Sequence, residues 1–408
     1  MIKSLRENWY LWIAAVATAG YPLISVLSVI FSIEGRGISI GYRACALLYV
    51  VSAGVYLLKQ RRLSLGLFGV AYLIFWLMYS GRLVAETLFR FEDLSHPIAD
   101  YYLFAFLVTL LPSLVCFVRL TRKEASFSGT ALWALCFFAS AGILATYFLI
   151  GSGGAMQFRF SLRTLNPISM GQIGATLALM SVFLIRSRER IVKTAAAFGG
   201  VVGLSILLVA ASRGPIIAFL SVLMLIVFAP IVNRRGNLSR SHVKAAFLLI
   251  LVLSTVAMPL IEYIESNSQF SIASRFRGLG SSSDESGMIR TQIFKGAWSQ
   301  FIDNPLFGDA LEERKIRTYP HNNILEAFLA TGILGGSILL GLYVATLINC
   351  IRLIASRDSY AWIGAVTLQY LLISLSSGVI WGSSVLFCLM ALASRNVRVA
   401  GKAETVGL

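Results

Sequence analysis

The sequence has 408 residues, of which 57% are apolar and 13% are charged, and its mean hydropathy is +0.78. Average soluble domains carry roughly a quarter charged residues, so this composition excludes a soluble globular enzyme, a disordered tail and a disulfide-rich secreted scaffold. The net charge of +16 would indicate nucleic-acid binding in a soluble protein. Here it indicates basic cytoplasmic loops, and we expect no nucleic-acid partner. The composition predicts an all-α polytopic membrane protein.

Apolar runs of about 20 residues, the length of a bilayer-spanning helix, follow one another along the chain. The candidate spans number about twelve: 9–31, 38–58, 63–80, 101–118, 129–150, 165–185, 194–211, 215–232, 245–261, 322–349, 360–376 and 379–394. The first is too long for a signal-peptide core and has no small-residue cleavage site, so we expect it to be retained. The chain therefore divides into nine spans at 1–261, a large loop at 262–321, and three spans with a tail at 322–408.

The charges fix the expected orientation of these spans. Numbering from a cytoplasmic N-terminus, the seven cytoplasmic segments contain 21 basic and five acidic residues, and the rest of the chain contains 14 of each. The whole net charge lies on one side, as the positive-inside rule requires. We expect both termini in the cytoplasm and the large loop between the ninth and tenth spans on the outer side of the membrane.

Two outer segments are longer than the rest, at about 81–100 and 262–321. In the second, Met288, Ile289, Ile293, Trp298 and Ile302 fall at helical spacings before Asn304-Pro305, which predicts an amphipathic helix on the membrane or over a cavity. The preceding stretch GLGSSSDESG is typical of a flexible linker. A loop of this length is normally functional.

His321 is the first candidate for chemistry. Pro320 suits the first turn of a helix, so His321 is expected at the outer mouth of a span. The positive end of the helix dipole would lower its pKa and keep the imidazole neutral, as a general base requires. A straight helix would place Gly332 about 20° around from His321 and roughly 16 Å deeper. Gly332, Gly335 and Gly336 would admit a neighbouring helix. The alternative is an interfacial histidine in contact with solvent.

Outer arginines are the second candidate. Arg159 and Arg163 lie in a short outer segment without acidic residues, and Arg213 lies in a Ser-Arg-Gly-Pro turn between two apolar runs. Arginine forks match phosphate oxygens, so these residues predict an anion site. Arg290 in the large loop is a further candidate, although a solvated charge is its simpler interpretation. Snorkelling to lipid headgroups explains Arg43, Arg82 and Arg90.

The spacing from Arg163 to Gly174 equals that from His321 to Gly332. Several other signals are missing from the sequence: a Walker phosphate loop, a zincin motif, a nucleophile elbow and an Asp-x-Asp metal motif. We therefore expect no metal ion and no cofactor. His96 and His242 are interpreted as incidental.

The segment 298–336, with Asn-Pro-Leu-Phe-Gly at 304–308 and His-Asn-x-x-Leu-Glu before Gly332, resembles the O-antigen polymerase and O-antigen ligase superfamily. The Ser-Arg-Gly turn at Arg213 and the large loop after the ninth span are also similar to it. The resemblance implies a metal-independent, inverting membrane glycosyltransferase at the periplasmic face. Its donor would be a glycan on undecaprenyl pyrophosphate.

By the same resemblance, His321 would accept the proton of the acceptor hydroxyl, and Arg213, Arg163, Arg159 and Arg290 would hold the pyrophosphate. Asn322, Glu326 and Gly332 would support them. The acceptor would be a carrier-linked repeat unit for a polymerase, which Tyr-Pro-His-Asn slightly favours, or the lipid A core for a ligase. A flippase or other transporter of lipid-linked oligosaccharide remains the alternative from another class, because twelve spans suit it equally well.

Overall fold

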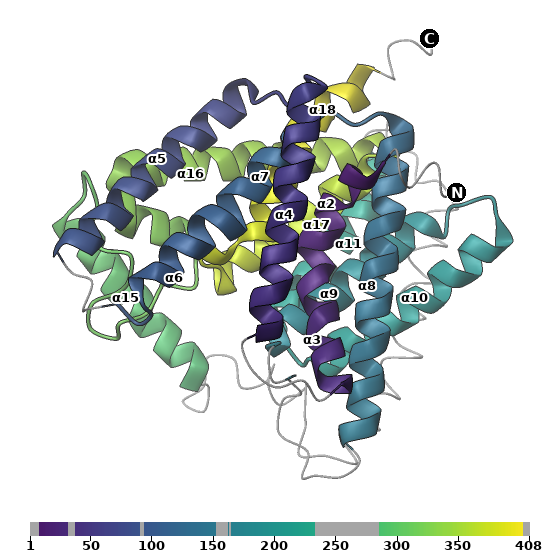
Figure 1. Ribbon diagram of the computed structural model, residues 1–408, viewed down its shortest axis with the longest axis horizontal. Coiled ribbons are helices and arrows are strands. Elements are labelled where there is room, and N and C mark those ends of the chain that lie inside the picture. The colour runs from purple at the N-terminus through teal and green to yellow at the C-terminus, as the bar shows by residue number, and fades with distance from the viewer. Residues whose placement is uncertain are drawn as a thin grey trace. The chain divides into compact units, whose positions relative to one another are not determined.

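A computed structural model describes residues 8–31, 37–89, 94–151, 162, 165–232 and 285–402. Within these ranges every regular element is a helix, and three isolated bridges are the only β-type pairings (Figure 1). The all-α prediction is confirmed for this part of the chain. The predicted span at 245–261 lies outside it.

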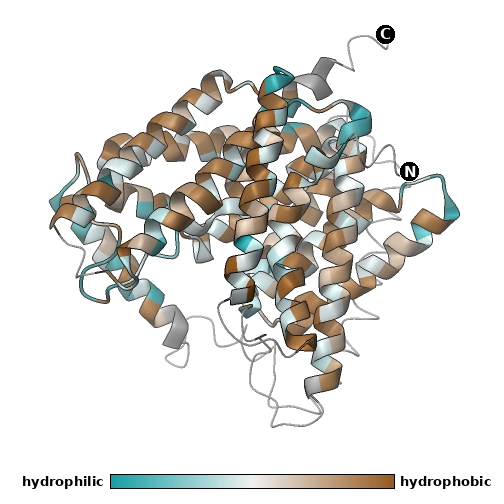
Figure 2. Cartoon of the chain, viewed as in Figure 1, coloured by the Kyte–Doolittle hydropathy of each residue, from teal (hydrophilic) through white to brown (hydrophobic). Residues whose placement is uncertain are grey.

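Eight helical segments in the described ranges are long and apolar enough to cross a membrane. They are Trp9–Ile30 (η1, α2, η2 and α3), α4 (Gly37–Lys59), α5 (Gly66–Phe89), Ile98–Val115 (α6, η4 and α7), α8 (Arg122–Gly151), α9 (Pro167–Leu184), α10 (Arg190–Val209) and α16 (Asn323–Ser356). Three helices contain shorter apolar segments: α11 (Arg213–Val232), α17 (Ala361–Ser377) and α18 (Ser384–Lys402). Figure 2 shows the apolar colouring along these helices and polar residues gathered at their ends. The number of about twelve spans stays a prediction.

The third predicted span ends too early. Helix α5 continues to Phe89, so residues 81–89 are helical rather than part of an outer loop. Arg82 and the buried Glu86 lie on this extension, and a hydropathy window ends before them because they are charged. The extension matters because both residues bond to the segment that precedes His321.

Contacts divide the chain into two compact units. The first contains residues 1–42, 122–279 and 351–369, and the second contains 43–121, 280–350 and 370–408. Both units draw on segments before and after the predicted large loop. The predicted division at residues 261 and 321 concerns topology, and it stays a prediction.

In the first unit, α8, α9 and α10 pack closely. Gly174 of α9 faces Gly203 of α10 so closely that a Cβ on Gly174 would lie 2.6 Å from the Gly203 carbonyl oxygen. Glycine thus lets the two backbones touch, as small residues do between membrane helices. At one end of the unit, Arg122 pairs with Asp358 at 3.2 Å. This ion pair joins two segments predicted to be cytoplasmic.

In the second unit, α5 presents a buried aromatic face. Tyr72, Phe75, Trp76 and Tyr79 are all at most 1% exposed, and the ring of Phe387 from α18 packs against Tyr72 and Trp76. The spacing of these side chains gives α5 one face that packs inside the unit. The same face continues toward the extension that carries Glu86.

Candidate active site around His321

His321 lies two residues before α16, which begins at Asn323. Pro320 therefore precedes the helix, and its predicted place in the first turn is wrong. His321 has a φ of +56°, a left-handed conformation that is uncommon for residues other than glycine, and its carbonyl accepts a hydrogen bond from the Gly378 amide at 3.2 Å. Strained backbone of this kind clusters at functional sites.

Asn322 caps the helix that follows. Its Oδ1 accepts hydrogen bonds from the backbone N–H groups of Ile324 and Leu325, both at 3.0 Å. Its Nδ2 donates to the Leu375 carbonyl at 2.9 Å, which ties this end of α16 to the end of α17. Because the cap satisfies otherwise unpaired helical donors, Asn322 fixes the backbone from which His321 projects.

The imidazole of His321 is half-buried and lies edge-on to the ring of Tyr319, with 4.5 Å between centroids. The ring of Tyr319 in turn packs edge-on against the ring of Trp381, with 6.2 Å between centroids. Burial and the positive charge of Arg290 lower the pKa of His321. The predicted direction is confirmed, but burial and Arg290 produce it. The ring is therefore neutral at pH 7 and able to accept a proton.

Glu326 is buried within α16 and fully used in hydrogen bonding. One carboxylate oxygen accepts from the Tyr79 hydroxyl at 3.1 Å, and the other accepts from the Ile380 amide at 2.9 Å. These bonds join α16 to α5 and to the turn η6 (Ile380–Gly382). Glu326 thus holds the elements around His321 in place, and its supporting role in catalysis stays a prediction.

Gly332 breaks α16 rather than continuing it. Its φ of +65° and ψ of −162° are non-helical, so the straight-helix placement relative to His321 is wrong. What approaches it is the backbone of Leu306 and Phe307, not another helix, and a Cβ on Gly332 would collide with the Leu306 carbonyl. The Ile333 amide donates to the Pro305 carbonyl at 2.7 Å. The Asn-Pro-Leu-Phe-Gly motif is therefore docked into the break.

Arg82 binds both the docked loop and helix α16 at this contact. Its guanidinium donates to the carbonyl oxygens of Phe307, Gly308, Asp309 and Ala330 at 2.7–2.9 Å. Snorkelling to lipid was therefore the wrong interpretation of Arg82. Arg43 is also better explained by its position over the Phe104 ring, at 4.5 Å. Arg90 lies outside the described residues.

Buried carboxylates near this segment were missed in the sequence. Glu312 accepts hydrogen bonds from the backbone and hydroxyl of Ser95, at 3.0 and 2.5 Å, and from the Tyr101 hydroxyl. His96, interpreted as incidental, contacts the rings of Tyr101 and Trp381. A local sequence pattern holds no signal for the bonds of Glu312, because Ser95 and Tyr101 lie more than 200 residues from it.

The predicted amphipathic helix exists as α15 (Glu285–Asp303). It begins inside the predicted linker, at Glu285. Ile293 is buried as expected, together with Ala297 and Phe301, but Trp298 and Ile302 are exposed. The apolar residues predicted to share one face therefore lie on two. Arg290 is half-buried on this helix, and its charge reaches both His321 and Tyr319.

Arg213 belongs to the first unit, where it begins α11 two residues after Ala211, whose φ is +45°. It interacts with other groups of the chain, so the lack of acidic neighbours in sequence does not by itself indicate a ligand. Arg159 and Arg163 lie outside the described residues. The structure thus places Arg290 and Asn322 beside His321, with Glu326 on the first turn of the helix that follows, whereas Gly332 contacts the 305–308 loop.

The fold and the site define a multi-pass membrane protein with a half-buried histidine just before an apolar helix. In the described part of the chain, no group of three or more His, Cys, Asp or Glu side chains is placed to hold a metal ion.

Residues 198–340 match the family model of the O-antigen ligase domain. The match includes Arg213, Arg290, His321, Asn322, Glu326 and Gly332, and it supports the resemblance of this part of the chain to the O-antigen polymerase and ligase superfamily. No curated protein matches the chain.

Proposed function

We propose that the protein is an inverting, metal-independent glycosyltransferase that moves a glycan from undecaprenyl pyrophosphate to an acceptor hydroxyl at the periplasmic face of the inner membrane. The observation that carries the proposal is His321, which lies within the family match on a left-handed backbone with a half-exposed ring and a lowered pKa. A neutral imidazole at a helix mouth is suited to general-base catalysis.

In the proposed reaction, His321 accepts the proton of the acceptor hydroxyl as its oxygen attacks the anomeric carbon. The new C–O bond forms on one face while the bond to the pyrophosphate oxygen breaks on the other, so the configuration inverts. Arg213 and Arg290, with Arg163 and Arg159, stabilise the charge that develops on the leaving pyrophosphate. This anion is a good leaving group, so a metal ion is not required. Activity is expected to be unchanged in EDTA, and strict metal dependence would contradict this part of the proposal.

The acceptor separates two versions of this function. In the preferred version a carrier-linked repeat unit is the acceptor, and the enzyme polymerises O-antigen or exopolysaccharide. The alternative is a ligase that transfers the glycan to the lipid A core, and the printed description of the matched family, O-antigen ligase, favours it. A flippase is the second alternative, and it would require a cavity that opens alternately to the two sides.

The orientation in the membrane is part of the proposal. Three segments predicted to be cytoplasmic come together in the first unit, since Arg122 pairs with Asp358 and the charge of Arg357 acts on Arg186. This clustering of basic segments at one end supports cytoplasmic loops there, with both termini on the same side.

The test is a surface-glycan gel from a deletion strain complemented with wild type, His321→Ala or His96→Ala. Lipid A core carrying a single repeat unit in the deletion strain identifies a polymerase, whereas long chains left on the carrier identify a ligase. We expect His321→Ala to lose at least about 100-fold in transfer, as removal of a general base does, and His96→Ala to complement. Normal glycan from a folded His321→Ala protein would overturn the proposal.

A further inference from the structure

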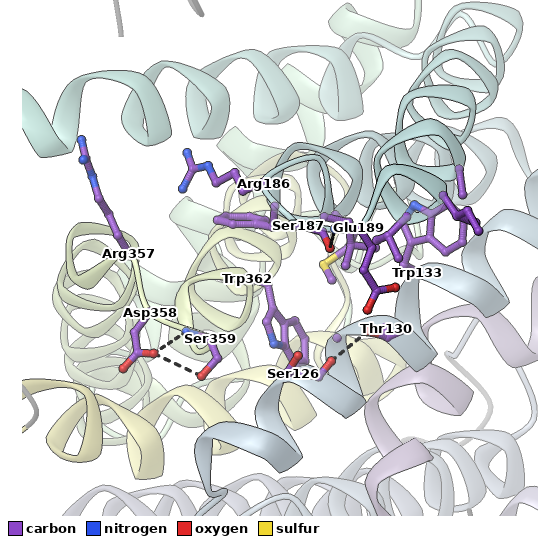
Figure 3. A pocket seen from close by; sticks show the side chains of 17 residues that line it. Ser126, Thr130, Trp133, Arg186, Ser187, Glu189, Arg357, Asp358, Ser359 and Trp362 are labelled. Atoms are coloured by element: carbon purple, nitrogen blue, oxygen red, sulfur yellow. Dashed lines mark hydrogen bonds between the residues drawn. The ribbon is translucent and has the colours of Figure 1, made fainter. Parts of the chain in front are cut away.

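A cavity in the first unit and an apolar surface in the second have no part in the proposed reaction. The cavity has a volume of about 560 Å³ and is lined by residues of α8, α9, α10 and α17 and of the segments that join them (Figure 3). Its wall contains two arginines, Arg186 and Arg357, and two carboxylates, Glu189 and Asp358, so it presents no net charge to a ligand. The apolar surface lies beside a helix long enough to span the membrane, and this position indicates what covers it.

The apolar surface begins on α15. Ile293, Ala297 and Phe301 bury one face of this helix in the second unit, whereas Trp298 and Ile302 are exposed. Two more large apolar side chains are exposed in the loop that follows the helix. The exposed residues of helix and loop together form the apolar rim: Trp298, Ile302, Leu306 and Phe307. Exposed apolar patches mark surfaces that contact a partner.

The apolar rim lies along α16, on both sides of the break in this helix. Before the break, the ring of Trp298 packs on that of Phe301, and Phe301 packs on Phe328 of α16, each pair with 5.3 Å between centroids. After the break, the Ile333 amide donates to the Pro305 carbonyl at 2.7 Å. The rim and α16 therefore belong to one continuous surface.

The charges on α16 place its break relative to the membrane. Residues 327–351 contain no charged side chain, and Arg352 ends this run. A helix needs about 20 apolar residues to cross the hydrocarbon core, and counting back that number from Arg352 leads to Gly332. The break therefore lies at the edge of the core, at the end of the span opposite Arg352.

The loop reaches this edge at the same depth. Ile333 and Leu334, the first residues of the span after the break, are about half exposed and thus face the lipid. Leu306 is 61% exposed and Phe307 is 70% exposed, and the backbone of both packs against Gly332. So much apolar surface is unfavourable in water, whereas acyl chains already cover the neighbouring residues of α16.

The outward side of α15 suits the headgroup region. Trp298 is a residue type enriched at the interface between membrane and water. Ile302 lies about 40° from it around the helix, and the exposed Lys295, on the same side, has a flexible stem that reaches headgroups. Gln292 is also exposed but lies about 120° from Trp298, so α15 has a polar edge that can remain in water.

We infer that the apolar rim is inserted in the phospholipid bilayer, with Trp298 at the headgroups and Leu306 and Phe307 against acyl chains. Helix α15 then lies in the membrane interface beside the break of α16, and not in water over a cavity. The partner is the bilayer that surrounds the spans, so no second protein is required. The inference does not depend on the proposed glycosyl transfer, because it concerns how this segment meets lipid.

The test measures the depth of nitroxide labels on the full-length protein in nanodiscs of phosphatidylethanolamine and phosphatidylglycerol. Labels are attached to Trp298→Cys or Phe307→Cys in a Cys45→Ser background, because Cys45 is exposed and the other four cysteines are buried. Electron paramagnetic resonance compares collisions with oxygen, which concentrates among acyl chains, and with a water-soluble nickel chelate. The matched controls are Gln292→Cys, on the polar edge of α15, and Lys315→Cys, in an exposed segment after the loop.

We expect the ratio of oxygen to nickel collisions to be several-fold higher at Trp298 and Phe307 than at the two controls. Equal ratios would overturn the inference, because the rim would then lie in water. Few collisions with either reagent would also overturn it, because a protein surface would then cover the rim.

A second measurement serves if a labelled variant cannot be reconstituted. The unmodified protein is irradiated in nanodiscs that contain a phospholipid with a diazirine in its acyl chain, and adducts are located by mass spectrometry. We expect adducts on peptides that contain Leu306 and Phe307 as well as on Ile333 and Leu334. Adducts on the span without any on the loop would overturn the inference.

Discussion

Gly174 of α9 follows Arg163 at the same sequence spacing as Gly332 of α16 follows His321. The two glycines nevertheless have opposite effects on their helices. Gly174 continues a regular helix and lets the backbone of α10 approach. Gly332 interrupts α16, and its left-handed conformation admits the loop at 305–308. The shared spacing in the sequence therefore does not reflect a shared structure. Only the break in α16 lies on the helix that follows the candidate catalytic histidine.

The largest effect is expected for Gly332→Ala. A side chain there needs a strained backbone and collides with the Leu306 carbonyl, so the combined cost is about 3 kcal/mol or more in the free energy of unfolding, and transfer should fall with it. Gly341→Ala on the same helix is the control, because its Cβ meets nothing within 4 Å. Equal thermal stability of the two variants in detergent would show that the break is not required.

Gly174→Ala should cost less, about 1–3 kcal/mol, because the backbone is helical and only the contact with Gly203, Ile206 and Leu207 of α10 is overpacked. Gly200→Ala in α10 is the control, since its Cβ would make an ordinary contact of 3.5 Å with Ser181. Thermal unfolding of both variants measures the difference. A loss for Gly174→Ala as large as that for Gly332→Ala would remove the distinction between the two helices.

Arg82→Lys tests whether the hydrogen bonds of Arg82 hold the 305–308 loop in the break of α16. A lysine keeps the charge but cannot donate to four carbonyl oxygens in a fixed fork, so we expect a loss of about 2 kcal/mol in stability. Arg43→Lys serves as the comparison, because an ammonium group retains a cation–π contact with Phe104. Unchanged unfolding of Arg82→Lys would mean that the loop is held by its other bonds.

The smallest effect is a shift in pH dependence. His321 acts as a base only when neutral, so kcat/KM falls as the pH drops through its pKa. Removing a positive charge in Arg290→Gln raises the pKa of His321, and the acidic limb of the pH profile should move to higher pH. Lys295→Gln, on the exposed side of the same helix, should leave the limb in place. If the acidic limb of the pH profile does not move in Arg290→Gln, a group other than His321 sets the pKa of that limb.

The sequence predicted the helices because each lipid-facing span must be apolar over its own length, a local property. It predicted His321 and Asn322 from a local motif. It did not predict the break at Gly332, because a straight helix was assumed beyond Pro320. Nor did it reveal the role of Arg82 or Glu312, since their partners come from distant segments and only the folded unit brings them together.

The hydrogen bonds of Arg82 have a consequence for how this protein can evolve. One side chain on α5 satisfies carbonyls of the 307–309 loop and of Ala330, and the loop needs glycine at both 308 and 332 to fit. Loss of the arginine would leave several carbonyls without a donor at once, and no single substitution elsewhere restores them. Among related sequences, positions 82, 308 and 332 are therefore expected to be kept together or replaced together.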